Sequence, residues 1–261
     1  MHLQILSSGS RGNCALVRAG NTHLLVDAGL TLRETHERLE LARVPPAKID
    51  HLAVTHGHLD HARSAGAFGR RHGTRLHCCA GVMSNASVRG APRYATLRIG
   101  DEQVLPGPGG DDGLRLRPVL LPHDAEPTVA FRLEQEGRVA VILTDLGTPD
   151  QALAGALRGA QVLVLEFNHD LDMLQRGPYP PFLKRRIAGA RGHLSNEQAA
   201  SLLPHLATDE LHTLVLAHLS ETNNTPERAQ AAAFAALRAM GREDVRVLVA
   251  GQREIGPNLA V

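Results

Sequence analysis

The sequence lacks the features of a secreted or membrane-bound protein. Its three cysteines, Cys14, Cys78 and Cys79, offer no disulfide framework, which favours a reducing compartment. No apolar run reaches the length of a membrane span, and the first residues have no basic segment followed by a long apolar one. We therefore expect a cytoplasmic protein with no signal peptide and no membrane association.

An excess of either charge is also missing. Lys and Arg total 28 and Asp and Glu total 27, so the formal net charge is +1. This balance gives no global electrostatic signature of nucleic-acid binding, and any such surface must be local. Lysine is scarce, with only Lys48 and Lys184, so arginine supplies nearly all the basic charge.

Metal-ligand chemistry is concentrated in one stretch. A short apolar run at 52–54, typical of a strand, leads into His56, His58, Asp60 and His61. On such a corner the first two histidines can point to one side while Asp60 and His61 point to the other. Imidazole and carboxylate together select borderline to hard divalent metals, including zinc and manganese. The spacing suits two metal ions that share one loop, and the alternative is a solvated, histidine-rich loop.

Further ligand-type residues stand at the ends of predicted strands. Alternating or continuous apolar patterns predict strands at 3–6, 14–18, 23–26, 75–79, 99–105, 114–121, 129–133, 139–143, 162–165, 214–217 and 245–249. The residues at or after strand ends are Asp27, His123, Asp145, Glu166 and His218. Because strand ends on one side of a sheet sandwich present groups on a rigid scaffold, these side chains are candidates for one site.

The rest of the chain predicts helices and loops around these strands. Helices are expected through Leu32–Leu41, at 62–72, from Ser195 or Asn196, and at 226–240, with a polar surface loop at 106–113. No internal repeat and no long linker divides the chain. We therefore expect residues 1–261 to form a single α/β domain.

Three features have two interpretations each. Asp27 either holds a ligand histidine by a hydrogen bond or caps the helix that follows it. The turn with Ser8, Ser10 and Asn13 either contacts a phosphate or simply connects two strands. The basic run Lys184, Arg185 and Arg186 either contacts a DNA backbone or is a solvated helix face.

The ordered set of Asp27, His56-x-His58-x-Asp60-His61, His123, Asp145 and His218 resembles the five motifs of the metallo-β-lactamase superfamily. This resemblance implies a four-layer αββα sandwich. A finer resemblance is to the YycJ/WalJ-type branch, related more distantly to ribonuclease Z. It rests on the segments 8–14, Thr144–Gly147, Asn168-His169-Asp170, Gly192–Asn196 and His218–Ser220, together with Asn223-Asn224.

The resemblance implies a role for each of these residues. It places His56, His58 and His123 on one divalent ion, zinc or manganese, and Asp60, His61 and His218 on a second. Asp145 would bridge the two ions and Asp27 would orient a ligand. Asp60 also counts among the catalytic residues, with Glu166 and His193 as an acid/base pair in which the histidine protonates the leaving oxygen. Candidate substrate contacts are Ser8, Ser10, Asn13, Asn168, His169, Lys184, Arg185, Arg186, Asn223 and Asn224.

Phosphodiester hydrolysis needs charge neutralisation and a nucleophile at neutral pH, and two metals that share a bridging hydroxide provide both. The resemblance implies a metal-dependent DNA exonuclease that acts on the 5′ end of duplex DNA, with DNA favoured over RNA, and we expect a place in DNA repair. The alternatives are a phosphodiesterase for small cyclic substrates, another metallo-hydrolase, and a metal-binding regulatory module without turnover.

Overall fold

The computed structural model describes residues 1–110 and 113–261, and its strands form two seven-stranded sheets. In the first sheet, β1, β2 and β3 are antiparallel, β14 pairs antiparallel with β1, and β3 to β6 are parallel. Its order is β14 (Leu259–Ala260), β1 (His2–Ser7), β2 (Cys14–Ala19), β3 (Thr22–Val26), β4 (His51–Ala53), β5 (Arg75–Cys79) and β6 (Tyr94–Leu97).

The second sheet repeats this pattern of antiparallel strands followed by parallel ones. Strands β7 to β10 are antiparallel, and β10 to β13 are parallel. Its order is β13 (Arg246–Val249), β12 (Thr213–Ala217), β11 (Val162–Glu166), β10 (Arg138–Leu143), β9 (Thr128–Gln135), β8 (Leu114–Leu121) and β7 (Gln103–Leu105).

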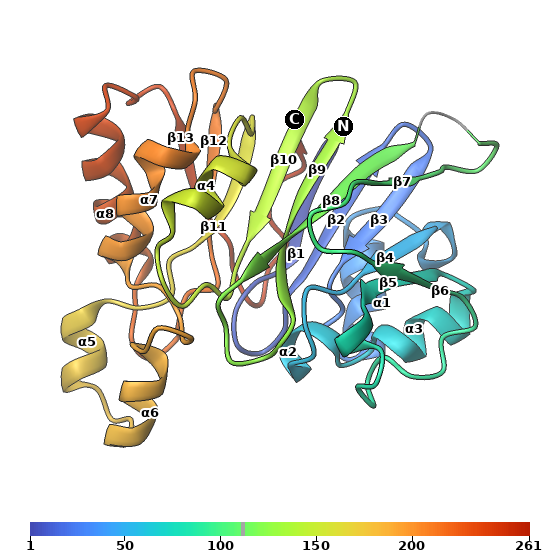
Figure 1. Cartoon of the computed structure of the whole chain (residues 1–261), viewed down its shortest axis with the longest axis horizontal. Coiled ribbons are helices and arrows are strands. Elements are labelled where there is room, and N and C mark those ends of the chain that lie inside the picture. The colour runs from blue at the N-terminus through green and yellow to red at the C-terminus, as the bar shows by residue number, and fades with distance from the viewer. Residues whose placement is uncertain (111–112) are drawn as a thin grey trace.

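Helices cover the outer faces of both sheets, which gives the four layers seen in Figure 1. Helices α1 (Leu32–Leu41) and α3 (Ala65–His72) lie against the first sheet, and α4 (Gln151–Leu157), α7 (Asn196–Leu206) and α8 (Pro226–Ala239) lie against the second. The remaining helices are α2 (Leu59–Ala62), α5 (Leu171–Arg176), α6 (Pro181–Ile187) and the short 3₁₀ turns η1 (Pro46–Lys48) and η2 (Ala80–Val82). The predicted αββα sandwich is confirmed.

Burial explains why these strands adopt their places. The five residues of β11 and the five of β12 are all buried, as expected for parallel strands covered on both faces. One apolar cluster fills the space between the sheets and includes Leu16, Phe131 and Val164. A second cluster packs the outer face of the second sheet against α4, α7 and α8.

The helix starts follow capping rules. Thr31 caps α1 in a capping box with Glu34, and Ser195 caps α7 in a capping box with Gln198. The cap interpretation of Asp27 is therefore wrong, because Thr31 occupies that position. Between Ser195 and Asn196, which the sequence left open, the cap is Ser195.

Several short elements differ from the sequence-based prediction. The strands β6 and β14 and the helix α4 were not predicted, and residues 99–102 lie outside any strand. The predicted helix 62–72 is divided into α2 and α3 around Arg63 and Ser64. Strand β14 is only two residues long and exists by pairing with β1, a contact that no local pattern reveals. The predicted loop 106–113 includes residues 111 and 112, which lie outside the described residues.

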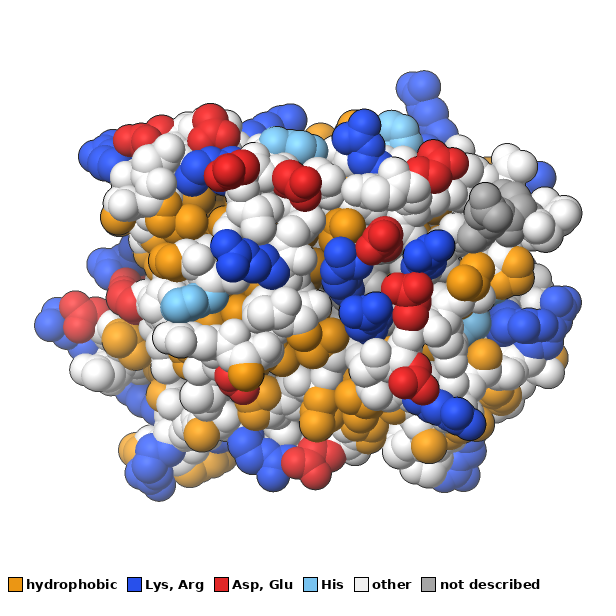
Figure 2. Space-filling view, turned by 45° about the horizontal axis from the view of Figure 1, so that its top comes forward, with side chains coloured by type: hydrophobic (Ala, Val, Ile, Leu, Met, Phe, Trp, Pro, Cys, Tyr) orange, Lys and Arg blue, Asp and Glu red, His pale blue; other side chains and the backbone are white. Residues whose placement is uncertain are grey.

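The surface agrees with the balanced charge. On the face in Figure 2, basic and acidic side chains are interspersed, so no field of one sign covers it. Among the described residues, no helix combines the length and the apolar character needed to cross a membrane.

Candidate metal centre

Histidine and carboxylate side chains from both sheets meet at one edge of the sandwich. Asp27 follows β3, the 56–61 segment follows β4, His123 follows β8, Asp145 follows β10 and His218 follows β12. Three of these residues, Asp27, Asp145 and His218, have left-handed backbones, with φ of 62°, 62° and 55°. Such backbones are rare for residues other than glycine and gather where geometry serves a site.

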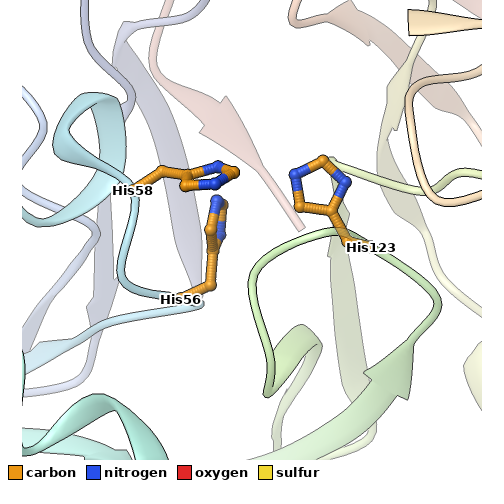
Figure 3. A group of neighbouring side chains, drawn as sticks. All are labelled: His56, His58 and His123. Atoms are coloured by element: carbon orange, nitrogen blue, oxygen red, sulfur yellow. The ribbon is translucent and has the colours of Figure 1, made fainter. Parts of the chain in front are cut away.

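The ligand-type atoms form four overlapping groups, and two of these contain the predicted ligands other than Asp145. His56, His58 and His123 bring ring nitrogens within 4.8 Å of one another, and Asp60, His61 and His218 do the same with a carboxylate oxygen. Figure 3 shows the first group: His56 and His58 rise from the segment after β4, and His123 faces them from the loop between β8 and β9. The structure thus brings together all the side chains predicted as metal ligands.

Asp145 lies between the two groups. Its Oδ1 is 3.6 Å from His218 Nε2 and 3.7 Å from His123 Nε2, and its Oδ2 is 3.1 Å from His61 Nε2. A single carboxylate therefore reaches ring nitrogens from both groups. This position is what a bridging ligand requires.

The donor atoms fit divalent metal ions. Two ligands that each lie about 2.0–2.1 Å from a tetrahedral ion are separated by about 3.3–3.4 Å, and Asp60 Oδ2 lies 3.5 Å from His218 Nε2 and 3.6 Å from His61 Nε2. The buried Nε2 atoms of His56, His123 and His218 and Oδ2 of Asp145 have no hydrogen-bond partner within the described chain. Because unsatisfied buried polar atoms are costly, four of them converging on one place indicate bound cations.

Hydrogen bonds on the far side of the rings fix their orientation. Asp27 Oδ2 lies 2.7 Å from His61 Nδ1, and Asp27 is itself held by the backbone N–H and hydroxyl of Thr55. His123 Nδ1 lies 3.0 Å from the carbonyl oxygen of Gly192. Only glycine fits at position 192, because a Cβ there would lie 2.1 Å from the carbonyl oxygen of Ile187. Such contacts select the tautomer that directs Nε2 toward a metal.

In the metal-free site, burial and neighbouring charges shift the pKa values of the ligand side chains in different directions. Burial lowers the pKa of His218, but the carboxylates of Asp145, Asp60 and Glu166 outweigh burial and raise the pKa to about 9. Burial raises the pKa of Asp145, but His218 and His61 outweigh it and hold the pKa well below its usual range. Burial and the neighbouring His61 lower the pKa of His56. The site therefore contains ionised carboxylates together with histidine rings for which protons and metal ions compete.

A second carboxylate–histidine pair adjoins the ligands. His193 Nδ1 lies 2.7 Å from Oε1 of the fully buried Glu166 at the end of β11. The other oxygen of Glu166 accepts hydrogen bonds from the backbone N–H groups of Leu146 and Leu194. Glu166 is thus fixed, and His193 is the member of the pair that reaches the open side.

A cavity of about 490 Å³ opens onto the metal-ligand groups. It is lined by Asp60, Asp145, His218, His193 and His58 from the site and by an apolar side from the region of α6. The other lining residues are Ser10, Leu59, Asp124, Asn168, Tyr179, Leu183, Arg186, Ile187, Gly192, Leu219 and Ser220. The ligands are therefore accessible to a substrate.

Of the ten predicted substrate contacts, three line this cavity: Ser10, Asn168 and Arg186. Asn168 also donates a 2.9 Å hydrogen bond to the carbonyl oxygen of His218, which places it as a support of a ligand. Arg186 forms a 2.6 Å ion pair with Asp124.

The structure does not place the other seven predicted contacts on the cavity. Ser8 accepts a hydrogen bond from the backbone of His218, and the amide nitrogen of Asn13 lies 2.9 Å from His61 Nε2. His169, Asn223 and Asn224 are buried, and Asn224 donates to the Phe167 carbonyl. Ser8, Asn13 and Asn224 thus contact neighbouring groups, whereas the polar side-chain atoms of His169 and Asn223 have no hydrogen-bond partner among the described residues. Lys184 and Arg185 lie on the surface of α6, where Lys184 bonds to the Gln175 carbonyl.

Sequence reasoning missed several residues of the site. Asp124, Leu59, Tyr179 and Thr55 were not singled out, yet the first three line the cavity and Thr55 orients Asp27. Three of them adjoin a predicted ligand in the sequence, because Asp124 follows His123, Thr55 precedes His56 and Leu59 follows His58. Tyr179 lies 56 positions from His123, and only the fold brings it to the cavity.

Comparisons with known proteins agree with this geometry. The model of the Metallo-beta-lactamase superfamily matches residues 8–218. Exodeoxyribonuclease YycJ of Bacillus anthracis is 32% identical over 234 residues, covering 88% of this chain and 86% of the relative. Exodeoxyribonuclease WalJ of Streptococcus pneumoniae is 31% identical, covering 86% and 84%. Zinc-bound PqqB from Methylobacterium extorquens has the same fold, with a TM-score of 0.71, 17% identity and full coverage of both chains.

Proposed function

The chain belongs to the metallo-β-lactamase superfamily and is a metal-dependent hydrolase, and from this premise we propose that it is an exonuclease that hydrolyses phosphodiester bonds of DNA from the 5′ end of a duplex. The observation that carries the proposal is the Glu166–His193 pair beside two groups of metal-ligand side chains. The names of the relatives, both called exodeoxyribonucleases, support DNA as the substrate.

We assign the metal ligands by the two groups and by Asp145 between them. His56, His58 and His123 would hold one ion, Asp60, His61 and His218 the other, and Asp145 both. Asp27 would orient His61. Two divalent ions, zinc or manganese, would neutralise phosphate charge and supply a nucleophilic water at neutral pH. The mixed nitrogen and oxygen donors suit either metal.

Glu166 and His193 would manage the proton of the leaving group. Burial lowers the pKa of His193, but Glu166 and Asp145 outweigh burial and raise it, so the ring remains protonated at higher pH than an ordinary histidine. A charged ring that lines the cavity can donate its proton to the departing sugar oxygen. The two backbone hydrogen bonds to Glu166 would hold the carboxylate, and with it the ring, in position for this transfer.

Substrate binding would rely on few residues at the cavity. Arg186 is the basic side chain that lines it, and Ser10 and Asn168 add polar groups. We assign Lys184 and Arg185, on the same helix, to the DNA backbone beyond the cleaved nucleotide, whereas the buried His169, Asn223 and Asn224 support the loops. Binding by so small a basic surface is consistent with the neutral overall charge.

We also assign the setting of this activity. Residues 1–261 act as one catalytic domain, in the cytoplasm, and a nuclease that degrades duplex ends serves DNA repair. The three free, buried cysteines support a reducing compartment.

A substrate panel tests the proposal. Purified protein is incubated with end-labelled single- and double-stranded DNA and RNA, with and without a 5′ phosphate, in zinc, manganese and magnesium. Duplex DNA should lose label from its 5′ end fastest. If duplex DNA stays intact while a small cyclic phosphodiester is cleaved, the protein is a small-molecule phosphodiesterase instead.

A further inference from the structure

Asp124 occupies a place that the assigned ligand set does not use. It follows His123 in the loop between β8 and β9 and lines the cavity. Its Oδ1 lies 3.3 Å from His58 Nε2 and 3.4 Å from His123 Nε2. These two distances lie within the separation of about 3.0–3.6 Å expected between neighbouring ligands of one five-coordinate ion with bonds of about 2.1 Å.

An ordinary hydrogen bond does not explain the contact with His123. The Nε2 atom of His123 is buried and has no hydrogen-bond partner among residues 1–110 and 113–261, although Asp124 Oδ1 is only 3.4 Å away. The two atoms are therefore close, but their geometry is not that of a hydrogen bond. Two ligand atoms that lie side by side in this way can both point to a third position, where a cation would lie.

The second oxygen of Asp124 faces away from the histidines. Its Oδ2 forms the 2.6 Å ion pair with Nε of Arg186 on α6. One carboxylate thus joins the cavity's arginine to the histidine group.

We propose that Asp124 is an additional ligand of the ion held by His56, His58 and His123, and that its second oxygen positions Arg186 for the substrate phosphate beside that ion. This proposal rests on the metal site assigned under the proposed function. An added carboxylate oxygen is a harder ligand than an imidazole nitrogen, so it shifts the preference of this ligand set toward manganese relative to zinc. Asp124 is therefore a determinant of metal choice as well as of phosphate position.

Metal titration of the metal-free protein by calorimetry, without DNA, tests the proposal. Asp124→Asn should weaken one metal-binding event by about 10- to 100-fold, with a larger loss for manganese than for zinc. Arg186→Gln should weaken metal binding less than Asp124→Asn does, because it removes only the hydrogen-bond partner of Oδ2 and leaves Oδ1 in place. Glu126→Gln is the matched control, because Glu126 lies in the same loop and pairs with Arg191.

Each outcome decides the question. If Asp124→Asn binds every metal with wild-type affinity, the ligand role is wrong. If Glu126→Gln weakens metal binding as much as Asp124→Asn does, the loss is a general effect of changing a carboxylate in this loop and the ligand role is again wrong. Circular dichroism of the metal-free variants confirms that each is folded. Because no nucleic acid is present, a protein that binds metals as described but leaves DNA intact would contradict the proposed function and not this inference.

Discussion

His193 Nδ1 and Glu166 Oε1 lie 2.7 Å apart, with the carboxylate fully buried and the ring open to the cavity. The two residues come from different elements, the end of β11 and the segment before α7. We propose this pair as the proton-transfer group, and it adjoins the metal ligands, since His193 Nδ1 lies 3.7 Å from Asp145 Oδ1. Burial lowers the pKa of His193, but Glu166 and Asp145 outweigh burial and raise it.

The pH profile of hydrolysis should reveal that pair. Because the charged carboxylates near His193 raise its pKa, the charged ring persists above its ordinary range and is lost as the pH rises through the raised pKa. Activity should therefore fall on the alkaline side of the profile. In Glu166→Gln this alkaline limb should move to lower pH, and His193→Ala should lower kcat by about 10²- to 10⁴-fold. An unchanged limb in Glu166→Gln would show that His193 is not the titrating acid.

Removing the orienting carboxylate should weaken metal binding. Asp27→Asn leaves His61 without its charged partner, and we expect metal affinity to fall by about 10- to 100-fold. Asp50→Asn is the control, because Asp50 accepts a hydrogen bond from the His23 backbone, remote from the ligands. Inductively coupled plasma analysis of dialysed protein measures the metals retained. Equal retention by the two variants would contradict the role of Asp27.

Metal binding should release protons. The pKa of His218 is about 9 in the metal-free protein, so this ring is mostly charged at pH 7.5 and must lose its proton to bind a metal. Metal affinity should rise with pH up to about 9. Calorimetry in buffers of different ionisation enthalpy counts the protons released. A binding enthalpy that is independent of the buffer would show that His218 is already neutral.

The basic surface of α6 should contribute to DNA affinity in a salt-dependent way. Arg185→Ala removes an exposed cation near the cavity and should reduce the slope of log affinity against log salt by about one. Arg33→Ala removes an exposed arginine on α1 and should leave the slope unchanged. Fluorescence anisotropy in calcium, without turnover, measures both. Identical slopes for the two variants would place the DNA elsewhere.

The order of ligand residues made much of the fold predictable. Each predicted strand that ends in Asp27, His123, Asp145 or His218 is present, because apolar β runs and the polar residues after them are local features. Contacts between residues that are far apart in the sequence could not be predicted in this way. Nothing in the sequence shows that Gly192 supplies the carbonyl for His123, since that contact spans 69 positions.

The substrate side was harder to predict for the same reason. His169 and Asn223 are polar residues in loops beside the site, and their types alone resemble substrate contacts. Their side chains are nonetheless buried, which only the packing of those loops reveals. Conversely, Asp124 stood next to a predicted ligand, and its importance follows from the direction of its side chain and its contact with Arg186 on a helix 62 residues away.

The most direct measurement of the central claim follows a 5′-labelled duplex during incubation with manganese-loaded wild type and Asp145→Asn. The wild type should release the label as mononucleotide from the first turnovers. Asp145→Asn, which loses the carboxylate between the two ligand groups, should be slower by at least about 100-fold. Equal release of mononucleotide by the two proteins, or an intact duplex with the metal-loaded wild type, would contradict the claim that this site is a metal-dependent DNA exonuclease.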